Sequence, residues 1–475
     1  MKKKYVRWTL WTIASPFILF IILCILIYLP PIQNFLVDKA AVYASEATGM
    51  NISVGRISLS FPLNLVVTNV DAASPHNDTL LSVRRLQVNV QLLPLLKKQV
   101  EVDGISLQGA TVNSNDLIHG MKLNGTLGEL FISSHGVALD PETAIVNKVL
   151  LKDTDLSLCL NDTAAADTAA SDTTYWKIIL QDIDLQNVSF ALDMPLDSLS
   201  LAASLDNAIL RDGLIDLHKS AYSLQTFRIE NGRVRYDNGK PLAADSLSSG
   251  LDPSHIALTD IGVKLDSLYY GGRNMKAIIS QFVLKERSGV EIVSATGRMV
   301  SNDKVLRVPS LKLETRDSYL ELNAAMDWNA LDFKGEGLMS ARLMADIGKP
   351  DVVRFMGRMD EKFVRQYPSE PLRIRTGIDG DLNKLKLTTL TAELPGALGL
   401  FARGELTHLT DSLLRGGDIT LEAETKDLKF VSTLAEGIEI PYGTRLEGKF
   451  TMAGAKMGTD LLLSLIHISE PTRPY

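Results

Sequence analysis

Apolar and polar residues alternate along most of this chain. From about residue 51 onward a period of two recurs in short runs, and the clearest is Leu86-Gln-Val88-Asn-Val90-Gln-Leu92. Side chains of a strand point alternately to the two faces of its sheet, so this pattern predicts strands with one apolar and one polar face. Sheets of this kind are usually antiparallel. The predicted fold class is therefore mainly β, a long, curved, groove-like antiparallel β-sheet array with a few short helices.

One strand motif occurs three times within this array. It runs apolar-x-apolar-x-[Gly/Asn]-x-x-apolar, with slips of one residue, and the copies begin at Ile105, Ile183 and Phe227. Each copy places Gly or Asn between two short apolar runs. This arrangement predicts a tight turn or a β-bulge at that residue.

Residues 8–29 predict a single N-terminal transmembrane helix. The stretch has 22 residues without a charge, and at 1.5 Å per residue it spans about 33 Å, close to the thickness of a hydrocarbon core. Lysines and an arginine within residues 2–7 predict a cytoplasmic N-terminus, with the rest of the chain beyond the membrane. The aromatic residues expected at the membrane interfaces are Trp8, Trp11 and Tyr28.

Two other interpretations of this segment are open. A cleaved signal peptide is disfavoured because the apolar run is long and Pro30-Pro31 stands where cleavage would occur. A buried core helix is disfavoured by the length of the uncharged run. An amphipathic helix is predicted next, from Pro31 in its first turn to a stop at Gly49.

The predicted organisation divides the chain into nine parts. The last part, 463–475, resembles the translation of a sequencing adapter, so the natural chain is expected to be longer. The parts are a cytoplasmic N-terminus 1–7, the transmembrane helix 8–29, the amphipathic helix 30–50, an N-terminal β region 51–160, a low-complexity loop 161–174, a β-repeat region 175–342, a helical insertion 343–370, a second β-repeat region 371–462 and the tail 463–475.

Composition and motifs point away from catalysis and nucleic acid. Lys and Arg total 49 against 56 Asp and Glu, a net charge of −7, which argues against nucleic acid as a partner. Cys24 and Cys159 lie in unrelated segments and predict no disulfide. No histidine has the spacing of a metal ligand, and no nucleophile or phosphate-binding motif is present. We therefore expect no enzyme activity, cofactor or metal.

Two acidic pairs, Asp153 with Asp155 and Asp182 with Asp184, alternate with apolar or small residues. The alternation predicts that both carboxylates of each pair face water on the polar side of a sheet. A calcium-binding or acid–base role is the alternative.

The apolar face of so many strands needs a cover, and the sequence predicts few helices to supply it. Either two sheets pack together around a dry core, or the sheet forms an open groove that lipid chains occupy. Periodicity alone does not separate these two solutions. The candidate groove residues are Leu86, Val88, Val90, Leu92, Val100, Val102, Ile105, Leu107, Ile183 and Leu185.

The features together resemble the AsmA/TamB family of bacterial envelope proteins, well over about residues 1–240 and more weakly to residue 462. The residues that carry the resemblance are the basic anchor segment, Pro30-Pro31, Ala47-Thr48-Gly49, the strand run 52–59 and the segment 102–110 (VDGISLQGA).

This resemblance implies an anchor in the inner membrane, with the bulk of the chain in the periplasm. It implies a β-groove, similar to that of bridge-like lipid transfer proteins, which carries phospholipid between the inner and outer membranes. The alternative it implies is a scaffold for outer-membrane protein assembly with a BamA-like barrel partner. The family offers no catalytic residues to carry over.

Overall fold

The computed structural model of this chain is mainly β, as the alternating pattern predicts. No helix in the part of the chain that it describes is long and apolar enough to cross a membrane. The predicted transmembrane helix 8–29, with Trp8, Trp11 and Tyr28, lies outside that part. The described residues are 39, 41–42, 45–46, 49–60, 64–74, 78–91, 102–114, 120–138, 142–161, 175–239, 250–331, 337–357, 360–434, 442–454 and 456–465.

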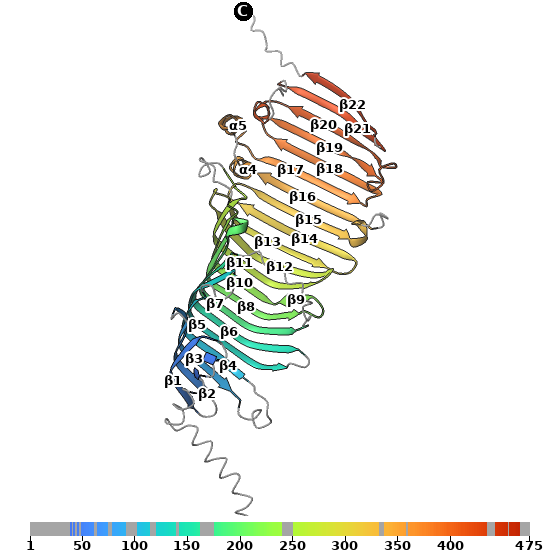
Figure 1. Ribbon diagram of the computed structural model, residues 1–475. Coiled ribbons are helices and arrows are strands. Elements are labelled where there is room, and N and C mark those ends of the chain that lie inside the picture. Colours follow the sequence, from blue (N-terminus) through green and yellow to red (C-terminus); the bar gives the residue numbers. More distant parts are fainter. Residues whose placement is uncertain are drawn as a thin grey trace, which may run out of the picture. The chain divides into compact units, whose positions relative to one another are not determined.

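The chain divides into two compact units, residues 1–218 and 219–475. In the first unit each strand pairs with the next strand in the sequence (Figure 1). Its strands are β1 (Asn51–Ser60), β2 (Asn64–Ala73), β3 (Thr79–Val90), β4 (Val102–Asn113), β5 (Met121–Ala138), β6 (Thr143–Leu160), β7 (Lys177–Met194) and β8 (Leu199–Asp216), with the short helix η1 (Pro195–Asp197) between the last two.

One pair in this unit departs from the predicted antiparallel arrangement. β6 and β7 are parallel, with Val149 opposite Ile183 and Leu151 opposite Leu185. Parallel neighbours need a long crossover, because the chain must return to the end at which it started. The connection 161–176 contains the whole of the predicted loop 161–174, of which residues 162–174 lie outside the described part. The parallel direction of β6 and β7 on the two sides of this segment was not predicted from the sequence.

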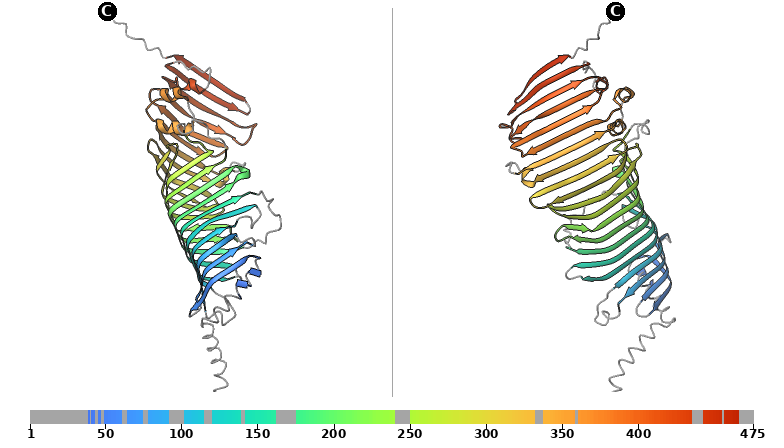
Figure 2. Two further views of the ribbon diagram at one scale, coloured as in Figure 1. Left: turned by 60° about the vertical axis from the view of Figure 1, so that its left-hand side comes forward. Right: turned by 180° about the vertical axis from the view of Figure 1, so that it is seen from behind.

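In the second unit each strand from β10 onward pairs antiparallel with the next strand in the sequence (Figure 2), and β9 pairs with β11. The strands are β9 (Ala221–Leu224), β10 (Thr226–Asp237), β11 (His255–Gly271), β12 (Asn274–Glu286), β13 (Glu291–Ser301), β14 (Val305–Thr315), β15 (Tyr319–Asp327), β16 (Met339–Ile347), β17 (Leu372–Gly380), β18 (Lys384–Leu394), β19 (Leu398–Thr407), β20 (Gly416–Thr425), β21 (Thr444–Ala453) and β22 (Lys456–Leu465).

The helical insertion is shorter than the predicted 343–370 and is divided in two. Residues 343–347 belong to β16, and the helices are α4 (Lys349–Met356) and α5 (Glu361–Gln366). Gly357, with φ of 74°, ends α4, and the Asp360 side chain caps α5 by accepting from the Lys362 amide. Two further short helices are η2 (Trp328–Leu331) and η3 (Val431–Thr433).

Two boundaries near the chain ends are also informative. At Gly49, where the amphipathic helix is predicted to stop, φ is 68° and the amide donates to the carbonyl of Ser45, which like Glu46 is helical. At the other end β22 pairs with β21 as far as Leu465, so the strand enters the predicted tail 463–475.

The recurrent motif places a left-handed residue inside a strand. Gly109, Asn187 and Asn231, the Gly or Asn of the three copies, have φ of 62°, 51° and 54°. The sheet register shifts between Ile229 and Gly232, which is a β-bulge at Asn231. Such a residue interrupts strict alternation, and this explains the slips of one residue in the repeated motif.

Candidate functional site

The feature shared by both units is a set of apolar rows that cross the strands. Residues opposite each other in neighbouring strands point to the same face, so a chain of register partners traces one row on one face. In the first unit, row 1 consists of Ile57, Val67, Leu86, Leu107, Leu130, Leu151, Leu185 and Ala208. Row 2 consists of Leu59, Leu65, Val88, Ile105, Ile132, Val149, Ile183 and Leu210.

The opposite face of the same strands is mixed, because one of its rows is polar and the neighbouring row contains Val66, Phe131, Leu150 and Ile209. A shift of one residue from row 1 gives a row in which every member carries a hydroxyl, an amide or a charge, and this polar row consists of Arg56, Thr68, Arg85, Gln108, Glu129, Lys152, Gln186 and Asn207.

The described residues leave the apolar rows partly open. Most row side chains are half-buried, and Ile105 is 37% exposed. Side chains at the centre of two packed sheets would be almost fully buried, because interiors are close-packed. The described part of the chain therefore provides no second sheet over rows 1 and 2.

Most of the candidate groove residues fall in these rows. Leu86, Leu107 and Leu185 lie in row 1, and Val88, Ile105 and Ile183 lie in row 2. Val90 and Val102 are register partners of each other at the end of β3 and β4. Leu92 and Val100 lie outside the described residues.

The row members of β5 and β6 were missed by sequence reasoning. Leu130, Ile132, Val149 and Leu151 complete the rows between β4 and β7. In β5 the glycines Gly125 and Gly128 interrupt the alternating pattern, which hid the signal. These residues can be assigned to the rows only from their register with β4, and that register is known only once the fold is known.

The second unit repeats the arrangement across β14 to β21. One central row consists of Leu311, Leu322, Leu343, Thr376, Leu390, Ala402, Leu421 and Gly448. A second consists of Leu313, Leu320, Ala345, Ile374, Ala392, Leu400, Ala423 and Leu446. The other face again has a row that is polar at every position except Ala325, and it consists of Arg307, Ala325, Ser340, Asp379, Lys386, Glu405, Asp418 and Thr451.

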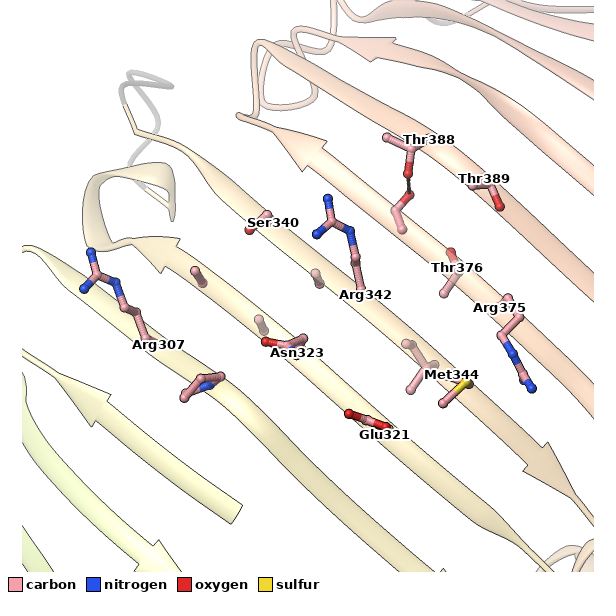
Figure 3. Close-up of a pocket in the computed structure, with 16 residues that line it drawn as sticks. Arg307, Glu321, Asn323, Ser340, Arg342, Met344, Arg375, Thr376, Thr388 and Thr389 are labelled. Carbon is pink, nitrogen blue, oxygen red and sulfur yellow. Dashed lines mark hydrogen bonds between the residues drawn. The ribbon is translucent and has the colours of Figure 1, made fainter. Parts of the chain in front are cut away.

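A shallow hollow of about 650 Å³ lies on this polar face, over β14 to β18 (Figure 3). Arg342 and Arg375 line it, and Arg375 Nη2 lies 2.8 Å from Asp346 Oδ1. Thr388 Oγ1 donates to the Gly377 carbonyl at 2.8 Å. Three arginines in its lining, Arg307, Arg342 and Arg375, distinguish this hollow from the apolar rows, which lie on the other side of the sheet.

A small apolar core closes one end of the strands in the second unit. Phe363 and Tyr367, at α5, pack with Phe430 and with Leu394, the last residue of β18. Phe363 is only 1% exposed, and burial raises the pKa of the Tyr367 hydroxyl. We call α4, α5, η3 and this core the cap; both views in Figure 2 place α4 and α5 beside the ends of the strands.

A buried polar network holds the cap to the sheet. Asp351 of α4, 1% exposed, accepts hydrogen bonds from the hydroxyls of Thr315 and Ser318, at the turn between β14 and β15. Arg354 Nη1 lies 3.1 Å from Asp351 and 2.8 Å from Asp317. Burial alone would lower the pKa of Arg354, but its bonds to the two carboxylates outweigh burial and raise it.

Asp351→Ala is expected to lower the stability of the cap by about 3 kcal/mol, because the hydroxyls of Thr315 and Ser318 lose their acceptor and Arg354 loses one of its two carboxylates. Hydrogen exchange of the α4 and α5 amides would measure the loss. Glu361→Ala is the control, since that carboxylate pairs with Arg365 in solvent and its removal should cost less than about 0.5 kcal/mol. Equal protection in the two variants would contradict the role given to Asp351.

The acidic pairs have protein partners. Asp182 and Asp184 both form ion pairs with Arg211 of β8. Asp153 Oδ1 accepts a hydrogen bond from the side-chain amide of Asn187 at 2.9 Å. Asp182 and Asp184 are half-buried, so the expectation that they face water freely was incomplete. Sequence reasoning did not identify Arg211 as the partner, because Arg211 lies opposite Asp182 only when β7 and β8 pair.

Other ionisable groups are also in contact with protein neighbours. Buried His255 has Nδ1 3.1 Å from Asp237 Oδ2, and a hydrogen bond from the Gly239 amide lowers the pKa of Asp237. Cys159 is a free thiol. Within the described ranges, no three His, Cys, Asp or Glu side chains cluster as metal ligands would.

No protein-family profile matches the chain, and no curated protein matches it.

Proposed function

We propose that this chain is a membrane-anchored carrier that holds phospholipid acyl chains against the apolar faces of its sheets. The observation that carries the proposal is rows 1 and 2, two unbroken apolar rows that cross all eight strands of the first unit and that the described residues leave partly open. At about 4.8 Å per strand, such a row is about 34 Å long.

The chemistry of the rows suits a hydrocarbon ligand. Burial of a methylene group contributes about 0.8 kcal/mol, so ten buried methylenes of a lipid tail would contribute about 8 kcal/mol before the cost of ordering the chain. A continuous row offers no fixed end point along the sheet. A tail can therefore move from strand to strand without losing its contacts, as transport requires.

The setting of this activity is part of the proposal. The uncharged segment 8–29 behind its lysines supports an anchor in the inner membrane with the strands in the periplasm. The resemblance to AsmA/TamB proteins supports transfer of phospholipid between the inner and outer membranes. Assembly of outer-membrane proteins with a BamA-like barrel is the competing role.

Photocrosslinking separates these roles. A photoreactive amino acid at Val88, in row 2, is expected to label phospholipid in cell membranes, whereas the same group at Gln87, on the opposite face of the sheet, should not. Mass spectrometry of the full chain would identify the adducts. Protein adducts at both positions without lipid at Val88 would favour the assembly role and overturn the carrier proposal.

A further inference from the structure

The two long edges of the apolar face in the second unit differ. At one edge the strands end under the cap, where Leu394, Thr425 and Thr444 are buried. At the other edge the outermost row is half-exposed along its length, and none of its described side chains is buried. The large side chains of this open-edge row are Leu306, Met326, Met339, Leu385, Leu406 and Met452.

The capped edge is sealed by packing that a lipid would have to disrupt. Phe363 packs against Tyr367 and Phe430, with ring centroids 5.5 and 5.8 Å away. This core contains no charged side chain. The nearest cations of the cap are already bonded, Lys349 to the Tyr367 carbonyl and Arg354 to Asp317 and Asp351. A phosphate-bearing head group placed in this core would therefore lose its water without gaining a free partner, which is strongly unfavourable.

The open edge has the opposite character. Its turn between β19 and β20 exposes Leu413 (84%) and Leu414 beside His408, Asp411 and Arg415. Arg415 Nε donates to the Gly454 carbonyl, which joins this turn to the next one along the edge. Apolar surface thus continues over the rim, and polar groups and water are available immediately beyond it.

The distance between the edges is long enough to contain one lipid tail. From Leu406 to Leu398 along β19 is eight residues, or about 27 Å at 3.4 Å per residue. Half of a hydrocarbon core is about 15 Å thick, which is the reach of one leaflet's acyl chains. A tail that lies along the strands therefore fits between the rim and the cap.

We propose that the second unit binds a phospholipid in one orientation, with the head group at the open edge and the acyl chains directed toward the cap. This inference rests on the proposed carrier function and adds the polarity of the bound lipid. The cap is then the closed wall of the binding face, and the turn at 408–415 is its rim.

Two photoreactive phosphatidylethanolamines test this polarity in membranes that contain the full chain. One carries a diazirine on the head group and the other carries it at the end of an acyl chain. We expect the head-group probe to label residues 408–415 at least about tenfold more than Leu398 and Leu400, a preference of about 1.4 kcal/mol. The chain-end probe should show the reverse.

The outcomes separate the two proposals. Reversed labelling, equal labelling at both edges, or head-group labelling confined to exposed Phe355 and Met356 on α4 would overturn the polarity while leaving a lipid carrier. No labelling of row residues by either probe would overturn the carrier itself. In Phe363→Ala, which weakens the cap, the head-group probe should gain access to Leu398; unchanged labelling in that variant, with the cap shown to be open, would contradict the cap's role as a wall.

Discussion

Leu107→Arg is expected to reduce lipid occupancy at the neighbouring row positions by about 100-fold. Leu107 lies in row 1 between its partners Leu86 and Leu130, so the new guanidinium would project among hydrocarbon groups. A charge placed at the centre of a hydrocarbon layer costs about 2.5–3.5 kcal/mol, and about 2.8 kcal/mol corresponds to a factor of 100. A photoreactive residue at Leu130 would measure occupancy as the yield of phospholipid adducts.

Ser106→Arg is the matched control for this variant. Ser106 is the adjacent residue on the same strand, but its partners Gln87 and Phe131 lie on the other face. The two variants introduce the same charge one residue apart, and only Leu107→Arg places it in the row. Equal adduct yields at Leu130 in both variants would show that the apolar face does not hold lipid.

The face of each strand could be predicted from sequence because the period of a strand is fixed at two. Once Leu86 and Val88 are placed on one side, Gln87 must lie on the other, and the same holds for Ile105, Ser106 and Leu107. Periodicity assigns residues to a face within each strand. The pairing between strands then aligns these residues into rows. This is why six of the candidate residues fall in just two rows.

What sequence reasoning missed depends on partners distant in the chain. Arg211 neutralises Asp182 and Asp184 only because β8 pairs with β7. The cap joins Phe363, Leu394 and Phe430, which come from a helix, a strand end and a loop. Two helices of eight and six residues carry too little apolar periodicity to predict that they seal an edge.

The cap therefore decides whether the second unit has one open edge or two. Its core is small, so loss of a single large side chain should be enough to open it. The rows lie on strands held by continuous backbone pairing, which does not depend on the cap. A variant that opens the cap should consequently change access to the face without removing the face.

Phe363→Ala is expected to destabilise the cap by about 3–5 kcal/mol, because it removes a fully buried aromatic side chain and leaves a cavity beside Tyr367 and Phe430. Hydrogen exchange should show faster exchange in α5 and at residues 428–434, while the strand amides of β18 and β19 keep their protection.

Phe355→Ala provides the control within the same helical segment. Phe355 is 55% exposed on α4, so its removal should change stability by less than about 0.5 kcal/mol. If exchange in α5 were as slow in Phe363→Ala as in Phe355→Ala, the core around Phe363 could not be what closes the edge. If the protection of β18 and β19 were lost together with that of α5, cap and sheet would form one cooperative unit, and the cap could not open independently to admit a lipid.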